Sequence, residues 1–200
     1  MRNYFVFDFE TTGFDATKDR VTQMTAGRVV NCEVVEIYNR YIKLDIPVPP
    51  KITEITGIDN KLLDEKGVDE KEAFHDLYEF IGEKAPLLGH NSIKFDRVFL
   101  NFFLKKHGLP ETNNYRHIDT AVLFKARELG IRRRPDERFF DFGTKIMDIR
   151  KYGLKFNLLH CCDCLKLNVT QYQAHRSDSD IMMTHLVYQH FYQQHLKTKA

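Results

Sequence analysis

The sequence predicts an α/β fold in which helices flank a mixed sheet. Two observations favour this class: strand-like segments come first, and helical segments then alternate with short apolar runs. Residues 3–9, 21–30 and 33–43 are expected to form three strands, with Asn31 near the turn between the second and the third. This order predicts an antiparallel meander.

The segment after the third strand, IPVPPKITEITGI at residues 46–58, carries three prolines that exclude an ordinary central strand. Residues 69–84 then show helical spacing, and Pro86 ends that helix. Its expected apolar face consists of Ala73, Phe74, Leu77, Phe80 and Ile81. The next run, LLGH at residues 87–90, predicts a short buried strand.

Four further elements are predicted in the rest of the chain. A helix at residues 94–107 is expected to bury Val98, Phe99, Phe102 and Phe103. The run YRHIDT predicts a strand that leads into a helix through Leu129. Asn157 is a suitable N-cap for a helix reaching Leu167, and a long final helix spans about residues 177–195.

The length, composition and net charge of the chain limit the class of protein. The 200 residues are 42% hydrophobic, and the net charge of +2 argues against a broadly basic surface, though not against a local basic groove. We expect one domain over residues 1–200, with a core at about 3–195 and a basic, aromatic insertion at about 131–153. The four cysteines, and the absence of a secretory signal or an apolar stretch of ~18 residues, predict a cytoplasmic protein without a membrane contact.

Two carboxylates stand in the first strand, within FVFDFETTGF at residues 5–14. Asp8 and Glu10 are two positions apart, so both point to one face of the strand, about 7 Å apart, while Phe7 and Phe9 point to the other face. Such a pair can hold a common cation. The alternative is an exposed strand face with two acids that have no role, but the flanking residues are apolar.

Two further motifs place polar groups at helix starts. In HNSIKFD, residues 90–96, His90 and Asn91 follow the short strand and Asp96 lies in the first helical turn, where acidic residues are also common without a role. In HRSDSD, residues 175–180, His175 and Asp180 surround three residues suited to capping, Ser177, Asp178 and Ser179. We interpret Asp178 as a cap.

The motifs DFETTG, HNSIKFD and HRSDSD, in this order, resemble those of the DEDDh 3′→5′ exonucleases, which include the DnaQ-like proofreading subunit of bacterial DNA polymerase III. ITEITGI, residues 52–58, is similar to the segment before the first long helix of that family. The resemblance spans roughly residues 3–190. It implies a ribonuclease H-like fold with a five-stranded mixed sheet.

Carried onto this sequence, the resemblance implies a role for each of five residues. Asp8, Glu10 and Asp180 would bind one divalent ion, and Asp8 would be shared with a second ion. Asp96 would act through metal-bound water, and His175 would be the general base. Hard oxygen ligands fit Mg²⁺ or Mn²⁺, and two such ions ~3.5–4 Å apart suit phosphodiester hydrolysis.

The loop after the acids would hold the terminal nucleotide. Thr11, Thr12 and Gly13 follow Glu10, and Phe14 either stacks on a base or belongs to the core. His90 and Asn91 are the other candidate substrate-binding residues, with a turn-stabilising role as the alternative for Asn91.

Other conspicuous residues have simpler interpretations. The basic and aromatic tract from Arg132 to Lys155 suits a strand-tracking groove, but a solvated loop is the favoured interpretation. HCCDC, residues 160–164, lacks zinc-ligand spacing, and Cys162 is expected in the core with Leu158, Leu159 and Leu165. Asp119 is interpreted as a helix cap, and His185 and His190 as surface or packing residues.

The resemblance implies a metal-dependent exonuclease that releases nucleoside 5′-monophosphates from the 3′ ends of single-stranded DNA or frayed duplexes, in proofreading or DNA repair. An exoribonuclease is the nearest alternative, because related folds degrade both polymers. A non-catalytic nucleic-acid-binding module and a small-molecule phosphohydrolase are further alternatives. A DNA polymerase is a candidate partner, and the oligomeric state stays open.

Overall fold

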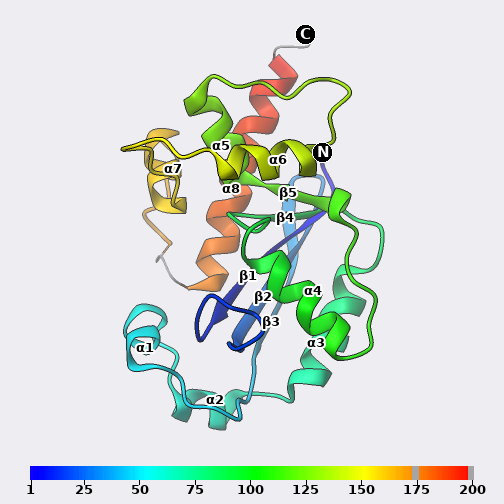
Figure 1. Cartoon of the computed structure of the whole chain (residues 1–200), viewed down its shortest axis with the longest axis vertical. Coiled ribbons are helices and arrows are strands. Elements are labelled where there is room, and N and C mark those ends of the chain that lie inside the picture. Colours follow the sequence, from blue (N-terminus) through cyan, green and yellow to red (C-terminus); the bar gives the residue numbers. More distant parts are fainter. Residues whose placement is uncertain (173–175, 198–200) are drawn as a thin grey trace.

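The computed structural model describes residues 1–172 and 176–197. Its centre is a five-stranded mixed sheet with the strand order β3-β2-β1-β4-β5 (Figure 1). The first three strands pair antiparallel, whereas β4 and β5 run parallel to β1. The strands are β1 (Tyr4–Thr11), β2 (Val21–Val30), β3 (Glu33–Tyr41), β4 (Leu87–Gly89) and β5 (His117–Asp119). The predicted meander and five-stranded mixed sheet are confirmed.

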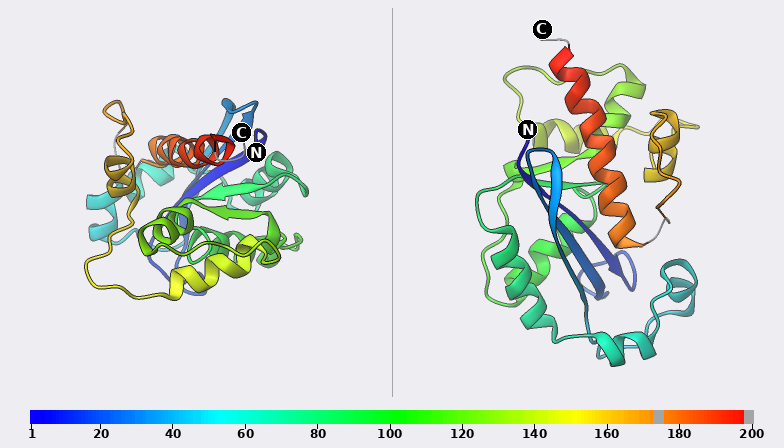
Figure 2. Two further views of the ribbon diagram at one scale, coloured as in Figure 1. Left: turned by 90° about the horizontal axis from the view of Figure 1, so that it is seen from above. Right: turned by 180° about the vertical axis from the view of Figure 1, so that it is seen from behind.

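Helices cover both faces of this sheet (Figure 2). Helix α8 packs on one face, and helices α3 and α4 pack on the other. The helices are α1 (Pro50–Thr56), α2 (Asn60–Lys66), α3 (Glu70–Ile81), α4 (Asp96–Lys106), α5 (Thr120–Leu129), α6 (Phe139–Asp148), α7 (Leu158–Cys164) and α8 (Ser177–Lys197), with a short 3₁₀ turn at Asn114–Arg116.

The alternation of side chains along β1 builds the two halves of the core. Phe5, Phe7 and Phe9 join the cluster that includes the apolar sides of α3 and α4. Tyr4 and Val6 face the other way and pack against α8. The two acids of β1 continue the Tyr4–Val6 face, because successive strand residues point to opposite sides. The sheet therefore presents Asp8 and Glu10 beside the start of α8.

The apolar face of α4 differs from the prediction. Leu100 and Leu104 are buried with Phe99 and Phe103, whereas Val98 is 41% exposed and Phe102 is 37% exposed. Asp96 fixes the rotation of this helix, because its carboxylate accepts a hydrogen bond from the β1 backbone. The prediction used only the apolar residues, so it missed the effect of this hydrogen bond on the orientation of the helix.

The basic and aromatic tract from Arg132 to Lys155, for which a solvated loop was the favoured interpretation, contains helix α6. Its Phe142 and Ile146 are buried against Ile93 and Val122. The arginines at 132–134 are exposed, as expected for a solvated stretch. Between residues 46 and 66, the prolines exclude a central strand as predicted, but the same segment forms α1 and α2, with a proline in the first turn of α1.

The prediction for the cysteine-rich helix is partly confirmed. Cys162 is buried in a cluster that contains Leu165, and Leu158 packs against it. Leu159 is 45% exposed, so its predicted core position is wrong. The four cysteines are all free. Within the described residues, no helix has the length and apolar character needed to cross a bilayer.

Candidate active site

Three carboxylates converge from two elements that lie far apart in the sequence. Asp8 and Glu10 project from β1, and Asp180 projects from the first turn of α8. One carboxylate oxygen from each lies within 4.8 Å of the others, and all three residues are half-buried. The sequence motifs at residues 5–14 and 175–180 are thus brought together in space.

A fourth carboxylate, Asp96, completes the acidic group from the first turn of α4. It is only 3% exposed, and its Oδ1 accepts a hydrogen bond of 3.0 Å from the backbone N–H of Phe9. This bond fixes the start of α4 against the middle of β1, between the two acidic residues of that strand. All four carboxylates line one cavity of about 540 Å³, which we call the acidic hollow.

The electrostatics of the acidic hollow disfavour four simultaneous negative charges. Burial, followed by the charges of Asp96, Glu10 and Asp180, holds the pKa of Asp8 well above its usual range. Burial raises the pKa of Glu10 to about 8, with further contributions from Asp180 and Asp96. Burial also raises the pKa of Asp96 to about 7. Bound cations would remove this penalty, so the carboxylate set fits divalent metal ions.

Asp119, at the end of β5, holds the motif at residues 90–96 in place through hydrogen bonds. It is fully buried and caps α5 by accepting a hydrogen bond from the N–H of Ala121, which agrees with its interpretation as a cap. The same carboxylate accepts hydrogen bonds from the N–H groups of Asn91, at 2.8 Å, and Ile93, at 3.0 Å. Asp119 thereby holds the turn in which Asn91 has a φ of 60°.

His90 lines the acidic hollow, but both of its ring nitrogens are engaged within the protein. Its Nε2 lies 2.8 Å from the Phe156 carbonyl oxygen, and its Nδ1 lies 2.8 Å from Thr120 Oγ1. A carbonyl only accepts, so Nε2 carries the proton and Thr120 donates to Nδ1. Burial lowers the pKa of His90 to about 4, so the ring is neutral. These contacts hold the ring in place, and the expected contact of His90 with substrate stays a prediction.

The loop between β1 and β2 is held by its own polar groups. Thr11 Oγ1 donates to the Gly13 carbonyl at 2.6 Å, and Thr12 Oγ1 accepts from the N–H of Arg20 at 2.9 Å. Gly13 is required by close packing, because a Cβ there would lie 2.4 Å from the Asp19 carboxylate. The hydroxyl groups of Thr11 and Thr12 are therefore used inside the loop, which leaves backbone atoms to meet a ligand.

Phe14, at the tip of this loop, is 89% exposed. The alternative that it belongs to the core is wrong. Its ring centroid lies 6.0 Å from that of Phe95, which lines the acidic hollow. The two rings stand beside the acids, where an unpaired base has a surface to stack on.

Another wall of the acidic hollow comes from residues 154–158, which include the end of the tract from Arg132 to Lys155 for which a solvated loop was the favoured interpretation. Leu154, Lys155 and Phe156, with Asn157 and Leu158 at the start of α7, line the acidic hollow. Lys155 is exposed, so it brings a positive charge to a hollow with four carboxylates. The available signal was a Lys at the end of a basic and aromatic tract, two residues before an N-cap Asn, which is too common to single out.

The start of α8 is fixed to the sheet by contacts that the motifs did not reveal. Ser177 Oγ and Thr25 Oγ1 lie 2.6 Å apart, and both residues are buried. Further along the helix, His185 Nδ1 lies 2.9 Å from Tyr4 Oη, so His185 is a packing residue as interpreted. Asp178 pairs with Arg176 and accepts from the N–H of Ser179. His175, the expected general base, lies outside the described residues.

The fold and the acidic hollow define the class of protein. The sequence model of the exonuclease family, RNase_T, matches residues 5–188 of the chain. The chain belongs to this exonuclease family.

Relatives among curated proteins include bacterial polymerases of the DNA polymerase III PolC type. The Bacillus cereus protein is 39% identical over 121 residues, which cover 60% of this chain and 8% of that protein. The Mycoplasma pneumoniae protein is 27% identical over 192 residues, which cover 96% of this chain and 12% of that protein. The chain spans about a tenth of the length of these relatives.

Solved structures of exonuclease I share the fold. The Escherichia coli enzyme in its zinc-bound complex with single-stranded DNA has a TM-score of 0.72 and 20% identity, covering 94% of this chain and 40% of that one. The enzyme from Methylocaldum szegediense has a TM-score of 0.70 and 21% identity, covering 94% of this chain and 39% of that one. This likeness confirms the expected ribonuclease H-like fold.

Proposed function

We propose that the protein is a metal-dependent 3′→5′ exonuclease that releases nucleoside 5′-monophosphates from single-stranded DNA. The observation that carries this proposal is the meeting of Asp8, Glu10 and Asp180, with Asp96 in the same hollow, in a chain of the exonuclease family. A binding module has no need of four carboxylates whose mutual repulsion must be compensated.

The ligand chemistry of the acidic hollow fits Mg²⁺ or Mn²⁺, both of which prefer carboxylate oxygens. We propose two ions, one held by Asp8, Glu10 and Asp180 and the other by Asp8, with Asp96 acting through water. When bound, such ions supply positive charge at the attacking and leaving oxygens of a phosphodiester.

The side chains around the ions perform the remaining tasks. His175 would accept the proton of the attacking water, as a neutral imidazole does near pH 7. Lys155 would attract the phosphate backbone from the wall at residues 154–158, and Phe14 would stack on the terminal base. The backbone of residues 11–13 and Asn91 would complete the contacts with the terminal nucleotide.

DNA is the favoured polymer because the polymerase relatives act on DNA by name, and the E. coli structural neighbour is described in complex with single-stranded DNA. We further propose association with a DNA polymerase and, given four free cysteines, action in the cytoplasm.

The decisive experiment incubates the purified protein with 5′-labelled single-stranded DNA, single-stranded RNA and duplex DNA. Each substrate is tested with Mg²⁺, Mn²⁺ or EDTA, and the products are resolved by length. We expect a ladder that shortens by single nucleotides on single-stranded DNA with metal and no cleavage with EDTA. Faster shortening of RNA would favour the exoribonuclease alternative, and intact substrates under all conditions would refute the proposal.

A further inference from the structure

The start of α8 rests on the sheet through two contacts that lie on either side of Asp180. Ser177, three residues before Asp180, and Ile181, the residue after it, are both fully buried. Residues three and four apart share one face of a helix, so Ser177, Asp180 and Ile181 point towards the sheet together. The position of the Asp180 carboxylate therefore depends on how its two neighbours contact the strands.

The first contact is a hydrogen bond between two hydroxyl groups. Ser177 Oγ and Thr25 Oγ1 lie 2.6 Å apart, and neither side chain is exposed. In the strand register, Thr25 lies opposite Asp8. Residues directly opposite in antiparallel strands point to the same face, with Cβ atoms about 4.5–5.5 Å apart. Helix α8 is thus attached to the immediate cross-strand neighbour of Asp8.

The second contact requires a glycine. Gly27 lies opposite Val6 in the register, and a Cβ on Gly27 would lie 3.1 Å from Val6 and 3.3 Å from Ile181. The missing side chain lets Ile181 pack directly on the sheet, in the apolar cluster that contains Val6. Apolar packing has no preferred direction, whereas a hydrogen bond has one. The hydroxyl pair of Thr25 and Ser177 therefore sets where α8 begins on the sheet.

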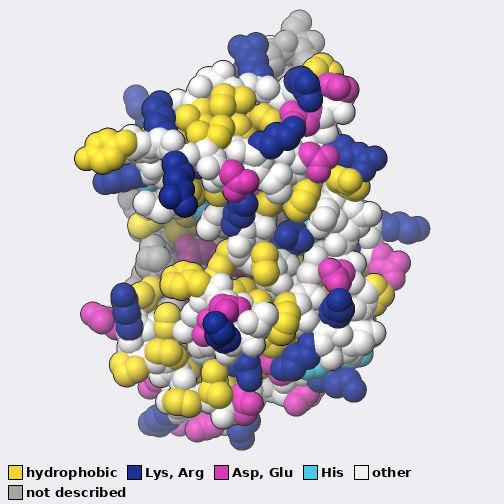
Figure 3. All heavy atoms as spheres, viewed as in Figure 1, with side chains coloured by type: hydrophobic (Ala, Val, Ile, Leu, Met, Phe, Trp, Pro, Cys, Tyr) yellow, Lys and Arg dark blue, Asp and Glu magenta, His cyan; other side chains and the backbone are white. Residues whose placement is uncertain are grey.

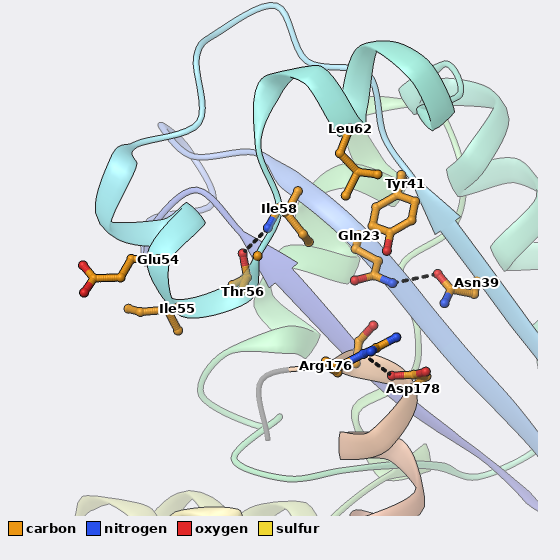
Figure 4. A pocket seen from close by; sticks show the side chains of 12 residues that line it. Gln23, Asn39, Tyr41, Glu54, Ile55, Thr56, Ile58, Leu62, Arg176 and Asp178 are labelled. Carbon is orange, nitrogen blue, oxygen red and sulfur yellow. Dashed lines mark hydrogen bonds and ion pairs between the residues drawn. The ribbon is translucent and has the colours of Figure 1, made fainter. Parts of the chain in front are cut away.

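The neighbouring polar side chains pair within the helix or within the sheet. Figure 4 shows Arg176 and Asp178, the residues on either side of Ser177, joined in an ion pair beside Gln23 and Asn39 of β2 and β3. Gln23 Nε2 donates to Asn39 Oδ1 at 2.9 Å. Exposed ion pairs such as that of Arg176 contribute little to stability. The bond of Ser177, in contrast, is buried and crosses from the helix to the sheet.

The spacing of the carboxylates decides which ion fits the acidic hollow. One oxygen each from Asp8, Glu10 and Asp180 lies within 4.8 Å of the others. Mg²⁺ requires a near-ideal octahedron with oxygens at about 2.0–2.1 Å, so two ligands of one Mg²⁺ lie at most about 4.2 Å apart. Ca²⁺ accepts about 2.3–2.6 Å and irregular geometry, which allows about 5.2 Å between ligands. Binding of Mg²⁺ therefore needs tighter control of the third carboxylate than binding of Ca²⁺.

We propose that the hydroxyl pair of Thr25 and Ser177 positions Asp180 for a small divalent ion and gives the acidic hollow its preference for Mg²⁺ over Ca²⁺. Both are positioning residues, because they act on the ion only through Asp180. The inference rests on the proposed function and deepens it, since it names what fixes the third metal ligand. Loss of a group that orients a metal ligand commonly lowers metal affinity by about 10–100-fold.

The test measures metal binding in the absence of DNA. The electron paramagnetic resonance signal of free Mn²⁺ reports binding of Mn²⁺, and added Mg²⁺ or Ca²⁺ competes, which yields the dissociation constant of each ion. Thr25→Val keeps the shape of the side chain and removes the hydroxyl. We expect Thr25→Val to weaken Mg²⁺ binding about tenfold and Ca²⁺ binding less than about threefold. Thr25→Ser keeps the hydroxyl and should bind both ions like the wild type.

A matched control is available on the same strand. Thr22 is also fully buried, and among residues 1–172 and 176–197 its Oγ1 has no recorded hydrogen-bond partner. Thr22→Val makes the same substitution without breaking a hydrogen bond, so both dissociation constants should stay unchanged. Asp180→Asn removes the charge of the ligand itself and should weaken the binding of both ions. Circular dichroism checks that every variant folds.

A second arm tests whether the two hydroxyl groups act as a pair. Ser177→Ala breaks the bond from the helix side and should reproduce the selective loss of Mg²⁺ affinity seen with Thr25→Val. The double variant should lose no more than either single variant, because both substitutions remove one bond. Losses that multiply in the double variant would overturn the inference.

The remaining outcomes separate positioning from stability and from the proposed function. Wild-type affinity of Thr25→Val for both ions would overturn the inference. Equal weakening of Mg²⁺ and Ca²⁺ binding, together with a lower melting temperature, would assign the pair to stability alone and would also overturn it. Absence of Mn²⁺ binding by the wild type would instead refute the metal dependence of the proposed function, and this inference with it.

Discussion

Asp8 lies on the central strand of the sheet, where the two metal ions are proposed to bind. Burial raises its pKa, and so do the charges of the other three carboxylates of the acidic hollow. We expect Asp8→Ala to lower kcat by at least about a thousandfold while the fold is kept, because no other side chain can take its place between two ions. Release of labelled mononucleotides and circular dichroism measure the two effects. Asp64→Asn, an exposed acid on α2, is the control, and wild-type turnover by Asp8→Ala would remove Asp8 from the site.

Glu10 makes the stability of the metal-free protein depend on pH. Its pKa is raised in the folded state to about 8, so its ionisation destabilises the fold above the unfolded pKa of about 4.3. We expect Glu10→Gln to melt at a higher temperature than the wild type at pH 8 in EDTA. The difference should shrink as the pH falls and vanish below about 3.5, where the glutamate is largely protonated in both states.

Calorimetry of the two proteins across this pH range measures the effect, and the comparison cancels the contribution of the buried histidines. Added Mg²⁺ should raise the melting temperature of the wild type more than that of the variant, since a bound ion stabilises the folded state. A wild type that is the more stable protein at pH 8 in EDTA would contradict the assigned burial of this carboxylate.

His90 joins the end of β4 to the wall of the acidic hollow through Thr120 and the Phe156 carbonyl. We expect His90→Ala to cost about 1–3 kcal/mol of unfolding free energy, since two polar groups lose their partner. KM for DNA should also rise, because the wall at residues 154–157 is no longer fixed. Denaturant unfolding and steady-state kinetics test this, with His190→Ala as the control. An unchanged KM would limit His90 to stability.

The helices and strands differ in how well they could be predicted from the sequence. The strand β1 was predictable because its aromatic residues alternate with its acids, and the hairpin turn at Asn31 because Asn readily takes the positive φ found there. Helix α6 was missed because charged residues at 132–138 precede it and its partner residues, Ile93 and Val122, lie in other elements. Lys155 ends the tract for which a solvated loop was the favoured interpretation, and only the fold places it beside the acids.

The distance along α8 between Asp180 and each basic residue predicts which basic residues contact a nucleic acid. Arg133 borders a cavity with Tyr192 of α8, whereas Asp180 lies twelve residues earlier, or roughly 18 Å along the helix. We expect the triple replacement of Arg132, Arg133 and Arg134 by Ser to leave the salt dependence of single-stranded DNA binding unchanged. Lys155→Ser should reduce the slope of log K against log salt by about 0.7, one phosphate contact.

Fluorescence anisotropy with a labelled oligonucleotide in EDTA measures these slopes. A flatter slope for the triple variant would show that the tract at residues 132–134 tracks the strand after all. An unchanged slope for Lys155→Ser would exclude this side chain as a phosphate contact.

For the whole molecule, the near-neutral net charge corresponds to a surface on which basic and acidic side chains are mixed. On the face shown in Figure 3, Lys and Arg side chains are interspersed with Asp and Glu side chains. Long-range attraction of DNA is therefore weak, and specific groups beside the acidic hollow must supply the contacts. The motifs contained acids that the fold brings together, but the wall of the acidic hollow at residues 154–158 is visible only once the chain is folded.

The central position of β1 in the sheet affects how the active site responds to heating and how fast its amide protons exchange with solvent. β2 pairs along the length of β1, and β4 pairs with it at Phe5 and Val6, so the amide protons of these two residues reach solvent water only when the sheet itself comes apart. The spacing of Asp8 and Glu10 is thus preserved until global denaturation. Deuterium uptake at Phe5 and Val6 should be among the slowest in the chain, and loss of catalysis on warming should coincide with melting instead of preceding it.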